Sequence, residues 1–583
     1  MVGRDSQQHS FLDAAWSAEP LLKKDDFYGT LFREGPQLYP DDFFIECYTV
    51  NNGRPSVPPS RMMKLVLLQH WEGLSDRQAL DRMAFDLRWK AVLGMEVGEP
   101  AVAQSTLVEF RTRLQVHDKM EEAFERFLER AVERELLDRK EAQVLDSTAI
   151  WGRGAVEDTF NLISSAAAKV LKATAAHRGE TATDVARETG LTYTAPVEQG
   201  SFKGRAEINW SKEEERRAFL NTVVEEARTL LTETRRDRGA NGEVREAAEL
   251  LARILCQDLE PISEDEDDRG APGEEEPALE LSSSSAADAG EAEEEETADP
   301  VLASGQSVRI RRGVARDRVV SVHDPEIRHG RKSHQRKWNG YKGHISVAAE
   351  SEFVTGVDVT PANAGDAEAG KGIMEAAESR GLKPAAWVGD MAYSAAEFRE
   401  TAQARGSQVC ARVPPTANRR GLFSKGDFTL DLEAGTATCP ADQTTDRRQD
   451  RKDGGGTFLF DGGRCAVCPL RDRCTSKDPE TMRSTGVGRT ISVHRREDLL
   501  QEGRAQEGSP AFEDLIKKRS LVERTIGHLM QRGLRQARYV GVAKTRFQAV
   551  ATALVYNVAH LGAVLRDQRE ATGPPMAPVA AAA

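Results

Sequence analysis

The sequence predicts a mixed α/β protein with one α/β core, an all-helical N-terminal domain and two modules that interrupt the core. Three observations predict this organisation. Helical periodicity dominates the first 135 or so residues. Short apolar runs then end in aspartate, at Asp146 and at Asp390. Between and after these runs lie an acidic low-complexity stretch and a group of four cysteines.

Charge is distributed unevenly along the 583 residues, whose formal net charge is −14. Residues 258–299 carry 18 acidic residues and one arginine, so without them the chain is slightly basic. The overall charge therefore does not exclude DNA as a partner. The N-terminus lacks the apolar segment of a signal peptide, and no apolar run approaches the roughly 20 residues of a membrane span. We expect a cytoplasmic, nucleoid-associated protein with no membrane partner.

Residues 1–138 are predicted to form the helical domain. Pro58 and Pro59 open one helix, and Ser75 with Gln78 forms a capping box that starts the next. Apolar periodicity carries this second helix through Leu87 to Val92. A further helix is expected from about His117 to Leu137. Two helices joined at a glycine suit a reader of DNA ends, whereas the alternative is a helical bundle with a solvated basic face. The basic residues of the second helix are Arg77, Arg82, Arg88 and Lys90.

The first core strand lies within residues 139–159 and ends at Asp146. Residues 160–257 return to helix-rich sequence, with a capping box at Ser211 and Glu214. Residues 258–300 contain too little apolar surface to fold and are predicted to be a disordered linker. We interpret 160–300 as an insertion into the core, with a linker between unrelated domains as the alternative.

The core continues over residues 301–413. A strand is expected at Arg318–Val322, and strands at Gly343–Ala348 and Phe353–Val359 should pair as a hairpin. A helix follows over Asp366–Ser379, then a strand ending at Asp390, a helix over Ala395–Ala404 and a strand over Gln408–Val413. The predicted order of strands and helices matches a ribonuclease-H-like fold.

One acidic residue, Glu523, stands within a basic helix in the C-terminal region, residues 506–568. Ile516, Ser520, Glu523 and Gly527 share one helical face. A carboxylate would repel phosphate unless it held a cation. We therefore predict that Asp146, Asp390 and Glu523 converge on a site for Mg²⁺ or Mn²⁺, which prefer oxygen ligands. Residues 569–583 are expected to be a disordered tail.

Four cysteines crowd into residues 414–505 with the spacing C-x25-C-x2-C-x5-C: Cys439, Cys465, Cys468 and Cys474. Four thiolates can close a structural Zn²⁺ site, and the two-residue spacing favours this reading. The alternatives are a reduced subdomain without metal and an iron–sulfur cluster.

The basic loop from Arg328 to Lys337 has aromatic neighbours in Trp338 and Tyr341. Basic and aromatic side chains together suit phosphate contacts and stacking on a DNA end, against the alternative of a solvated loop. The predicted DNA-binding residues are Arg331, Lys332, Arg336, Lys337, Trp338, Lys342, Arg519, Arg524, Arg532 and Arg535.

The motifs resemble those of the DDE transposases of bacterial insertion sequences, in the branch with a helical N-terminal domain and a cysteine cluster before the last glutamate. They are Asp146-Ser147-Thr148, Asn339-Gly340-Tyr341-Lys342-Gly343-His344, Gly389-Asp390-x-Ala392-Tyr393-Ser394 and Val522-Glu523-Arg524. The resemblance implies Asp146, Asp390 and Glu523 as the metal-binding triad and Arg519 as the signature arginine. Ile516 and Met530 replace the family's tyrosine and lysine, which leaves Arg532 or Arg535 to grip the terminal phosphate.

The resemblance implies a transposase that cleaves the ends of its mobile element and joins them to target DNA. Its partners would be double-stranded terminal inverted repeats and target DNA, and cleaving two ends suggests a homodimer or larger assembly. Two alternatives stay open: an inactive DNA-binding protein derived from a transposase, and a related nuclease without strand transfer.

Overall fold

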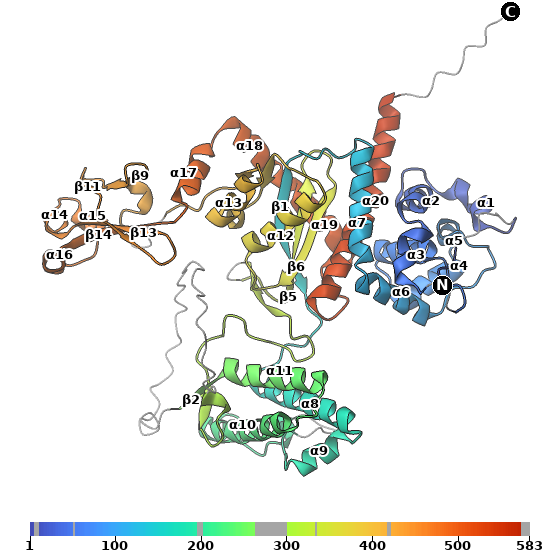
Figure 1. Ribbon diagram of the computed structural model, residues 1–583, viewed down its shortest axis with the longest axis horizontal. Helices are drawn as coiled ribbons and strands as arrows, with labels where there is room; N and C mark the ends of the chain where they lie inside the picture. The colour runs from blue at the N-terminus through green and yellow to red at the C-terminus, as the bar shows by residue number, and fades with distance from the viewer. Residues whose placement is uncertain are drawn as a thin grey trace, which may run out of the picture.

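Figure 1 shows the computed structural model, which describes residues 1–4, 11–49, 53–194, 202–262, 300–332, 335–416 and 421–572. Most of the predicted acidic linker lies outside the described residues, and so do the last eleven residues of the predicted tail.

A six-stranded sheet lies at the centre of the described chain. Its strands follow the order β6, β5, β1, β7, β8, and β4 pairs with the first residues of β5. β1 is antiparallel to β5, whereas β7 and β8 continue the sheet in parallel with β1. The bounds are β1 Gln143–Trp151, β4 Arg328–Arg331, β5 Lys337–Ala348, β6 Val354–Pro361, β7 Ala386–Val388 and β8 Gln408–Cys410.

The core elements after β4 confirm much of the predicted order. β5 and β6 form the expected hairpin, whose turn holds Glu352 at a φ of 59°. Helix α12 spans Asp366–Ser379, and α13 spans Ala396–Ala404. The predicted strand at Arg318–Val322 is wrong. Its backbone turns to helix α11 instead, where Val319 N–H donates to Gln257 Oε1 at 2.8 Å.

The N-terminal region is helical and packs on the C-terminal helix α20, Val542–Thr572. One hydrophobic core runs from these helices through the sheet to α20. The capping box at Ser75 is confirmed. The second helix is shorter than predicted, because the Asp86 side chain caps a new helix by accepting from Arg88 N–H. The helices are α1 Ala14–Ala18, α2 Phe27–Leu38, α3 Pro59–Glu72, α4 Asp76–Phe85, α5 Leu87–Leu93, α6 Gln104–Val116 and α7 Lys119–Glu133.

The segment after β1 forms a helical unit with a hydrophobic core of its own, drawn in green below the sheet in Figure 1. The predicted cap at Ser211 is wrong: α10 begins at Glu213 after Lys212, with no side-chain cap. Residues 259–261 of the predicted linker are strand β2, which pairs with β3. The elements are α8 Thr159–Arg178, α9 Ala182–Glu188, α10 Glu213–Arg236, α11 Gly242–Asp258, β2 Leu259–Pro261 and β3 Val308–Ile310.

The cysteine-rich module holds two small three-stranded sheets and a third hydrophobic cluster, drawn in orange at the left of Figure 1. Helix α17, Glu497–Gln506, leads back from it and contacts α13 of the core. The elements of the module are β9 Thr429–Asp431, β10 Thr436–Thr438, β11 Thr444–Thr445, β12 Arg448–Asp450, β13 Gly456–Asp461, β14 Val487–Val493, α14 Gly462–Ala466, α15 Arg471–Cys474 and α16 Pro479–Thr485.

The helix expected around Glu523 is two helices, α18 Pro510–Lys517 and α19 Arg519–Leu529. The break at Lys518 leaves Ile516 in α18 and places Ser520, Glu523 and Gly527 in α19, so the predicted face does not belong to one continuous helix. The chain then kinks within Met530–Leu534, where Arg532 and Gly533 leave helical geometry and Gly533 has a φ of 98°.

Helix α20 continues to Thr572, so the first residues of the predicted tail are helical. By length and composition its segment Val542–Glu570 could cross a membrane, with a mean hydropathy of 1.4. The prediction that no segment is long and apolar enough is therefore wrong. However, 67% of the most apolar stretch of this helix is buried inside the protein, so these apolar residues form core.

Candidate active site

Asp146 and Asp390 lie at the same level of two neighbouring parallel strands. The register pairs Val144 of β1 with Val388 of β7, and each aspartate follows its paired valine by two residues. Adjacent strands are about 4.8 Å apart. The structure therefore brings these two carboxylates together at the carboxyl end of β7, where open α/β sheets expose functional groups.

The Asp146 side chain is buried within β1, which continues to Trp151 through its pairing with β5, so the prediction that the strand ends at Asp146 is wrong. Its Oδ1 accepts a hydrogen bond from Ser147 N–H at 2.7 Å. Burial raises the pKa of the Asp146 carboxyl, and the Asp390 carboxylate raises it further, whereas Lys332 and Arg519 act in the opposite direction. The carboxyl thus has a neighbouring carboxylate and two cations that partly offset its burial.

Asp390 is held by a short 3-10 turn, Met391–Ser394, of which it is the N-cap. Its Oδ1 accepts from Ala392 N–H at 2.9 Å, and its carbonyl accepts from Tyr393 N–H at 3.1 Å. No role for Tyr393 is predicted from the sequence alone. The sequence feature that points to one is Gly389, because a Cβ there would lie 2.7 Å from the Tyr393 ring.

Glu523 lies on α19, which packs on β1 and β5. Its side chain is 61% exposed, and Arg519 Nη2 lies 3.8 Å from Glu523 Oε1. Arg519 is thus close to Glu523, and its positive charge also acts to lower the pKa of Asp146. Among the described residues, no three His, Cys, Asp or Glu side chains are arranged closely enough to hold a metal ion. The structure therefore brings together the two aspartates and leaves the Glu523 side chain in solvent.

The β4–β5 hairpin presents exposed basic side chains next to this site. Arg331 lies opposite Lys337 in the hairpin register, and Lys332 N–H donates to the Arg336 carbonyl at 3.0 Å. All four side chains are exposed. Lys332 is also close enough to lower the pKa of Asp146. Ser333 and His334 of the predicted loop lie outside the described residues.

The aromatic neighbours of this hairpin do not face solvent. Trp338 is 7% exposed, and its Nε1 donates to the Tyr341 carbonyl at 2.9 Å. Tyr341 is fully buried, and its hydroxyl donates to the Asp324 carboxylate. The prediction that these rings stack on DNA bases is therefore wrong, because protein atoms cover them.

The remaining predicted DNA-binding residues differ in what they contact. Lys342 is largely buried and lies 2.9 Å from Asp366 Oδ1, and Arg524 pairs with Glu352 at 2.8 Å. The Arg532 guanidinium lies 4.2 Å from the centroid of the Trp71 ring on α3. Arg535 is exposed, and its backbone carbonyl accepts from Trp151 N–H.

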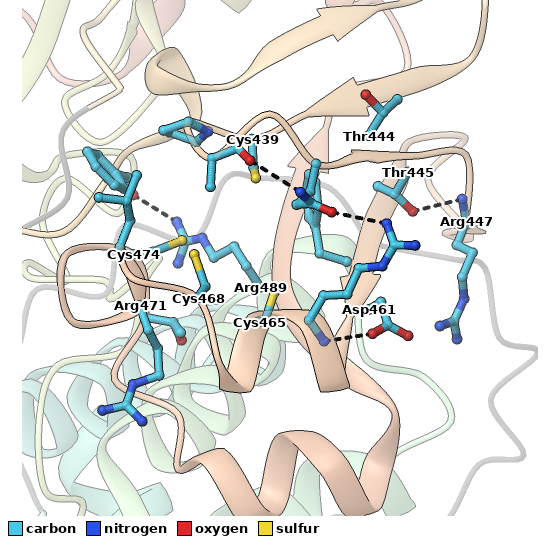
Figure 2. A pocket seen from close by; sticks show the side chains of 18 of the residues that line it. Cys439, Thr444, Thr445, Arg447, Asp461, Cys465, Cys468, Arg471, Cys474 and Arg489 are labelled. Atoms are coloured by element: carbon cyan, nitrogen blue, oxygen red, sulfur yellow. Dashed lines mark hydrogen bonds between the residues drawn. The ribbon is translucent and has the colours of Figure 1, made fainter.

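The four clustered cysteines line one pocket of about 250 Å³ in the cysteine-rich module, as Figure 2 shows. All four are free thiols. Burial and the neighbouring thiols raise the pKa of Cys474 to about 11, whereas Arg489 acts to lower it. The backbone at Gly488 lies close to the Cys465 side chain, because a Cβ at Gly488 would lie 2.4 Å from Cys465 Sγ. The structure thus gathers the four predicted ligands around one cavity without the closed geometry of a metal site.

Comparison with known protein families identifies two segments. Residues 17–113 match the family described as Transposase domain (DUF772). This segment includes α3 and α4. Residues 438–562 match the family described as Transposase DDE domain, which covers the cysteine cluster and Glu523. No curated protein and no solved structure matches the chain significantly.

The two matched domains indicate a transposase. More narrowly, they confirm the resemblance to the DDE transposases of insertion sequences that the sequence motifs carry.

Proposed function

We propose that the protein hydrolyses a phosphodiester at each end of its mobile element and transfers the freed strand ends into target DNA. The observation that carries the proposal is the adjacency of Asp146 and Asp390 on paired parallel strands, in a chain with two transposase domains. The strand order β6, β5, β1, β7, β8, with α19 packed on β1, supports a ribonuclease-H-like core.

The donor set fits a hard divalent cation such as Mg²⁺ or Mn²⁺. Asp146 and Asp390 offer carboxylate oxygens, and a cation between them would relieve the repulsion that raises the pKa of Asp146. Glu523, on the helix packed against β1, would add a third carboxylate. A bound cation would stabilise the charge that develops on phosphate oxygens during displacement. The protein residues hold the ends in place and neutralise phosphate charge.

The substrate in this proposal is double-stranded DNA, first the element ends and then the target. Arg331, Lys332, Arg336 and Lys337 would contact phosphates beside the acidic pair, and Arg519 and Arg535 would add further phosphate contacts. Because two ends must be cut together, we propose a homodimer or larger assembly on DNA. The four clustered cysteines would hold a structural Zn²⁺, since four thiolates are a complete ligand set for this ion.

The proposal is tested with labelled duplexes that carry the DNA flanking this gene. Wild-type protein with Mg²⁺ should cut at inverted repeats, and Asp390→Ala should lose cleavage by a factor of at least about 100, because the cation would lose a ligand. EDTA should abolish cutting in both. Asp567→Ala, which removes an exposed carboxylate from the end of α20, is the control and should cleave like the wild type.

Joining is measured in the same reaction with a supercoiled target plasmid. Joined products establish strand transfer, whereas cleavage without joining would favour a related nuclease. Specific binding without cleavage at any Mg²⁺ or Mn²⁺ concentration would contradict the proposal and favour an inactive DNA-binding descendant.

A further inference from the structure

A group of buried polar side chains lies near the two aspartates, and it includes two atoms without a hydrogen-bond partner among the described residues. These atoms are His344 Nδ1 and the Tyr393 hydroxyl, whereas Asp366 Oδ1 forms an ion pair with Lys342 Nζ at 2.9 Å. Unpartnered groups are rare in folded proteins, because burying a polar atom without a partner costs free energy. Two of them near one acidic centre call for an explanation.

The Tyr393 ring supports the backbone of Asp390 directly. One edge of the ring lies against Gly389, where a Cβ would be 2.7 Å from Tyr393 Cδ2. The other edge lies against α12, where a Cβ on Gly370 would be 3.1 Å from Tyr393 Cε1. The ring is therefore held between two glycines, and the residue is 1% exposed.

The Tyr393 hydroxyl is a hydrogen-bond donor among carboxylates. Burial raises its pKa well above the usual value, and Asp366, Asp146 and Asp390 raise it further, in that order. The hydroxyl therefore stays protonated at neutral pH and can donate to an acidic oxygen. It has no such partner in the structure.

Asp366, whose charge acts on this hydroxyl, also lies close to two residues of β5. Lys342 Nζ lies 2.9 Å from Asp366 Oδ1 in an ion pair and donates a hydrogen bond to the Ala364 carbonyl at 2.7 Å. His344 Nδ1 lies 3.9 Å from the same Asp366 oxygen, and its Nε2 is bonded to Thr360 Oγ1. Burial lowers the pKa of His344 to about 4, so the ring is neutral.

We propose that Tyr393, held between Gly389 and Gly370, is a positioning residue for the acidic centre, and that the charge of Asp366 influences its hydroxyl. Its ring fixes the backbone of Asp390, and its hydroxyl donates to a carboxylate of the centre when a divalent cation binds. The inference rests on the proposed function of Asp146 and Asp390. Residues behind metal ligands orient those ligands, and their loss commonly costs about 10-fold or more in metal affinity.

The test compares Tyr393→Phe with Tyr39→Phe in the full-length protein. Tyr39 is a matched control, because its hydroxyl is also fully buried and has no hydrogen-bond partner among the described residues. It lies in the N-terminal helical region, where Arg126 is the one charged group of the described chain that affects its pKa. Mn²⁺ binding is measured by calorimetry without DNA. Cleavage is measured as a function of Mn²⁺ concentration.

Tyr393→Phe should weaken Mn²⁺ binding about 10-fold and raise the Mn²⁺ concentration needed for half-maximal cleavage by a similar factor. Tyr39→Phe should change neither quantity. Without cation, both variants should melt at or above the wild-type temperature, since each loses only an unpartnered hydroxyl. Asp366→Asn should weaken binding in the same direction, and the double variant Asp366→Asn with Tyr393→Phe should fall short of the sum of the two effects.

Wild-type Mn²⁺ affinity in Tyr393→Phe, with loss of binding in Asp390→Ala, would overturn this inference and leave the proposed centre intact. Unchanged binding in Asp390→Ala would overturn the centre itself and the inference with it. Equal losses in Tyr39→Phe and Tyr393→Phe would show a general effect of the substitution and also overturn the inference.

Discussion

At the scale of single residues, buried tyrosine hydroxyls that the sequence cannot distinguish have different structural roles. Tyr341 donates to Asp324 at 2.6 Å and accepts from Gly541 N–H at 3.0 Å, so it ties β5 to the start of α20. Asp324 is fully buried, and burial raises the pKa of its carboxyl. A buried carboxyl depends on such hydrogen bonds.

We expect Tyr341→Phe to lower the free energy of unfolding by about 1–3 kcal/mol, because it leaves the Asp324 carboxyl without this donor. Urea unfolding at neutral pH measures the change. Tyr39→Phe, which removes a hydroxyl without a partner, should be neutral or stabilising. Equal stability of the two variants would contradict the assigned hydrogen bond.

Arg532 and Arg535 are equivalent candidates for terminal-phosphate binding in the sequence, but they differ in exposure. Arg532 is covered by Trp71, whereas Arg535 is exposed. Arg535→Ala should weaken binding to element ends and reduce the slope of log K against log salt by about 1, with unchanged stability. Arg532→Ala should instead lower the free energy of unfolding by about 1 kcal/mol, through loss of the cation–π contact.

Filter binding at several salt concentrations, with urea unfolding of the same preparations, separates these effects. A loss of DNA affinity in Arg532→Ala at unchanged stability would reverse the assignment of the two residues.

At the scale of elements, local signals decide where helices begin and end. Ser75 and Gln78 cap α4 as their spacing predicts, and Asp86 ends the helix early by capping α5. In the cysteine-rich module, by contrast, short strands bring Cys439 to the pocket lined by three cysteines that follow 26 or more residues later. The clustering of four thiols depends on this packing.

Zinc at these four thiols predicts about one ion per chain by elemental analysis. Cys468→Ser should lower the zinc content and the melting temperature, because a structural site contributes directly to stability. Cys47→Ser changes a buried cysteine of the N-terminal region and should keep the zinc. Full stability of the protein after chelation, with no zinc found, would favour a reduced module without metal.

At the scale of the whole molecule, the N-terminal helices and α20 form one core with the sheet. His70 of α3 lies inside this core, with its ring 6.4 Å from the Phe547 ring of α20. Burial, helped by Arg538 and Arg111, lowers the pKa of His70 to about 3, although the Val66 carbonyl and Asp76 act in the opposite direction. The folded protein therefore binds this proton less readily than the unfolded chain.

The difference between the folded and unfolded pKa of His70 decides how stability changes with pH. The contribution of neutral His70 is fully present above about pH 6.5 and is lost as the pH falls toward 3. Between pH 7 and pH 5 the loss should be about 2 kcal/mol. In His70→Gln the decrease in unfolding free energy over this range should be smaller by that amount. Urea unfolding at the two pH values measures it, and an unchanged pH dependence would contradict a buried neutral His70.

The sequence by itself determined the elements whose signals are local. The β5–β6 hairpin, α12 and the start of α4 follow from residues a few positions apart, and the strand before Asp390 follows from an apolar run. Tertiary structure alone decided which groups meet or are covered. The register of β1 on β7 joins residues more than 240 positions apart, and the burial of Trp338 depends on neighbours that no local pattern reveals. Burial and strand pairing are properties of packed surfaces, and a residue's own sequence neighbourhood does not contain them.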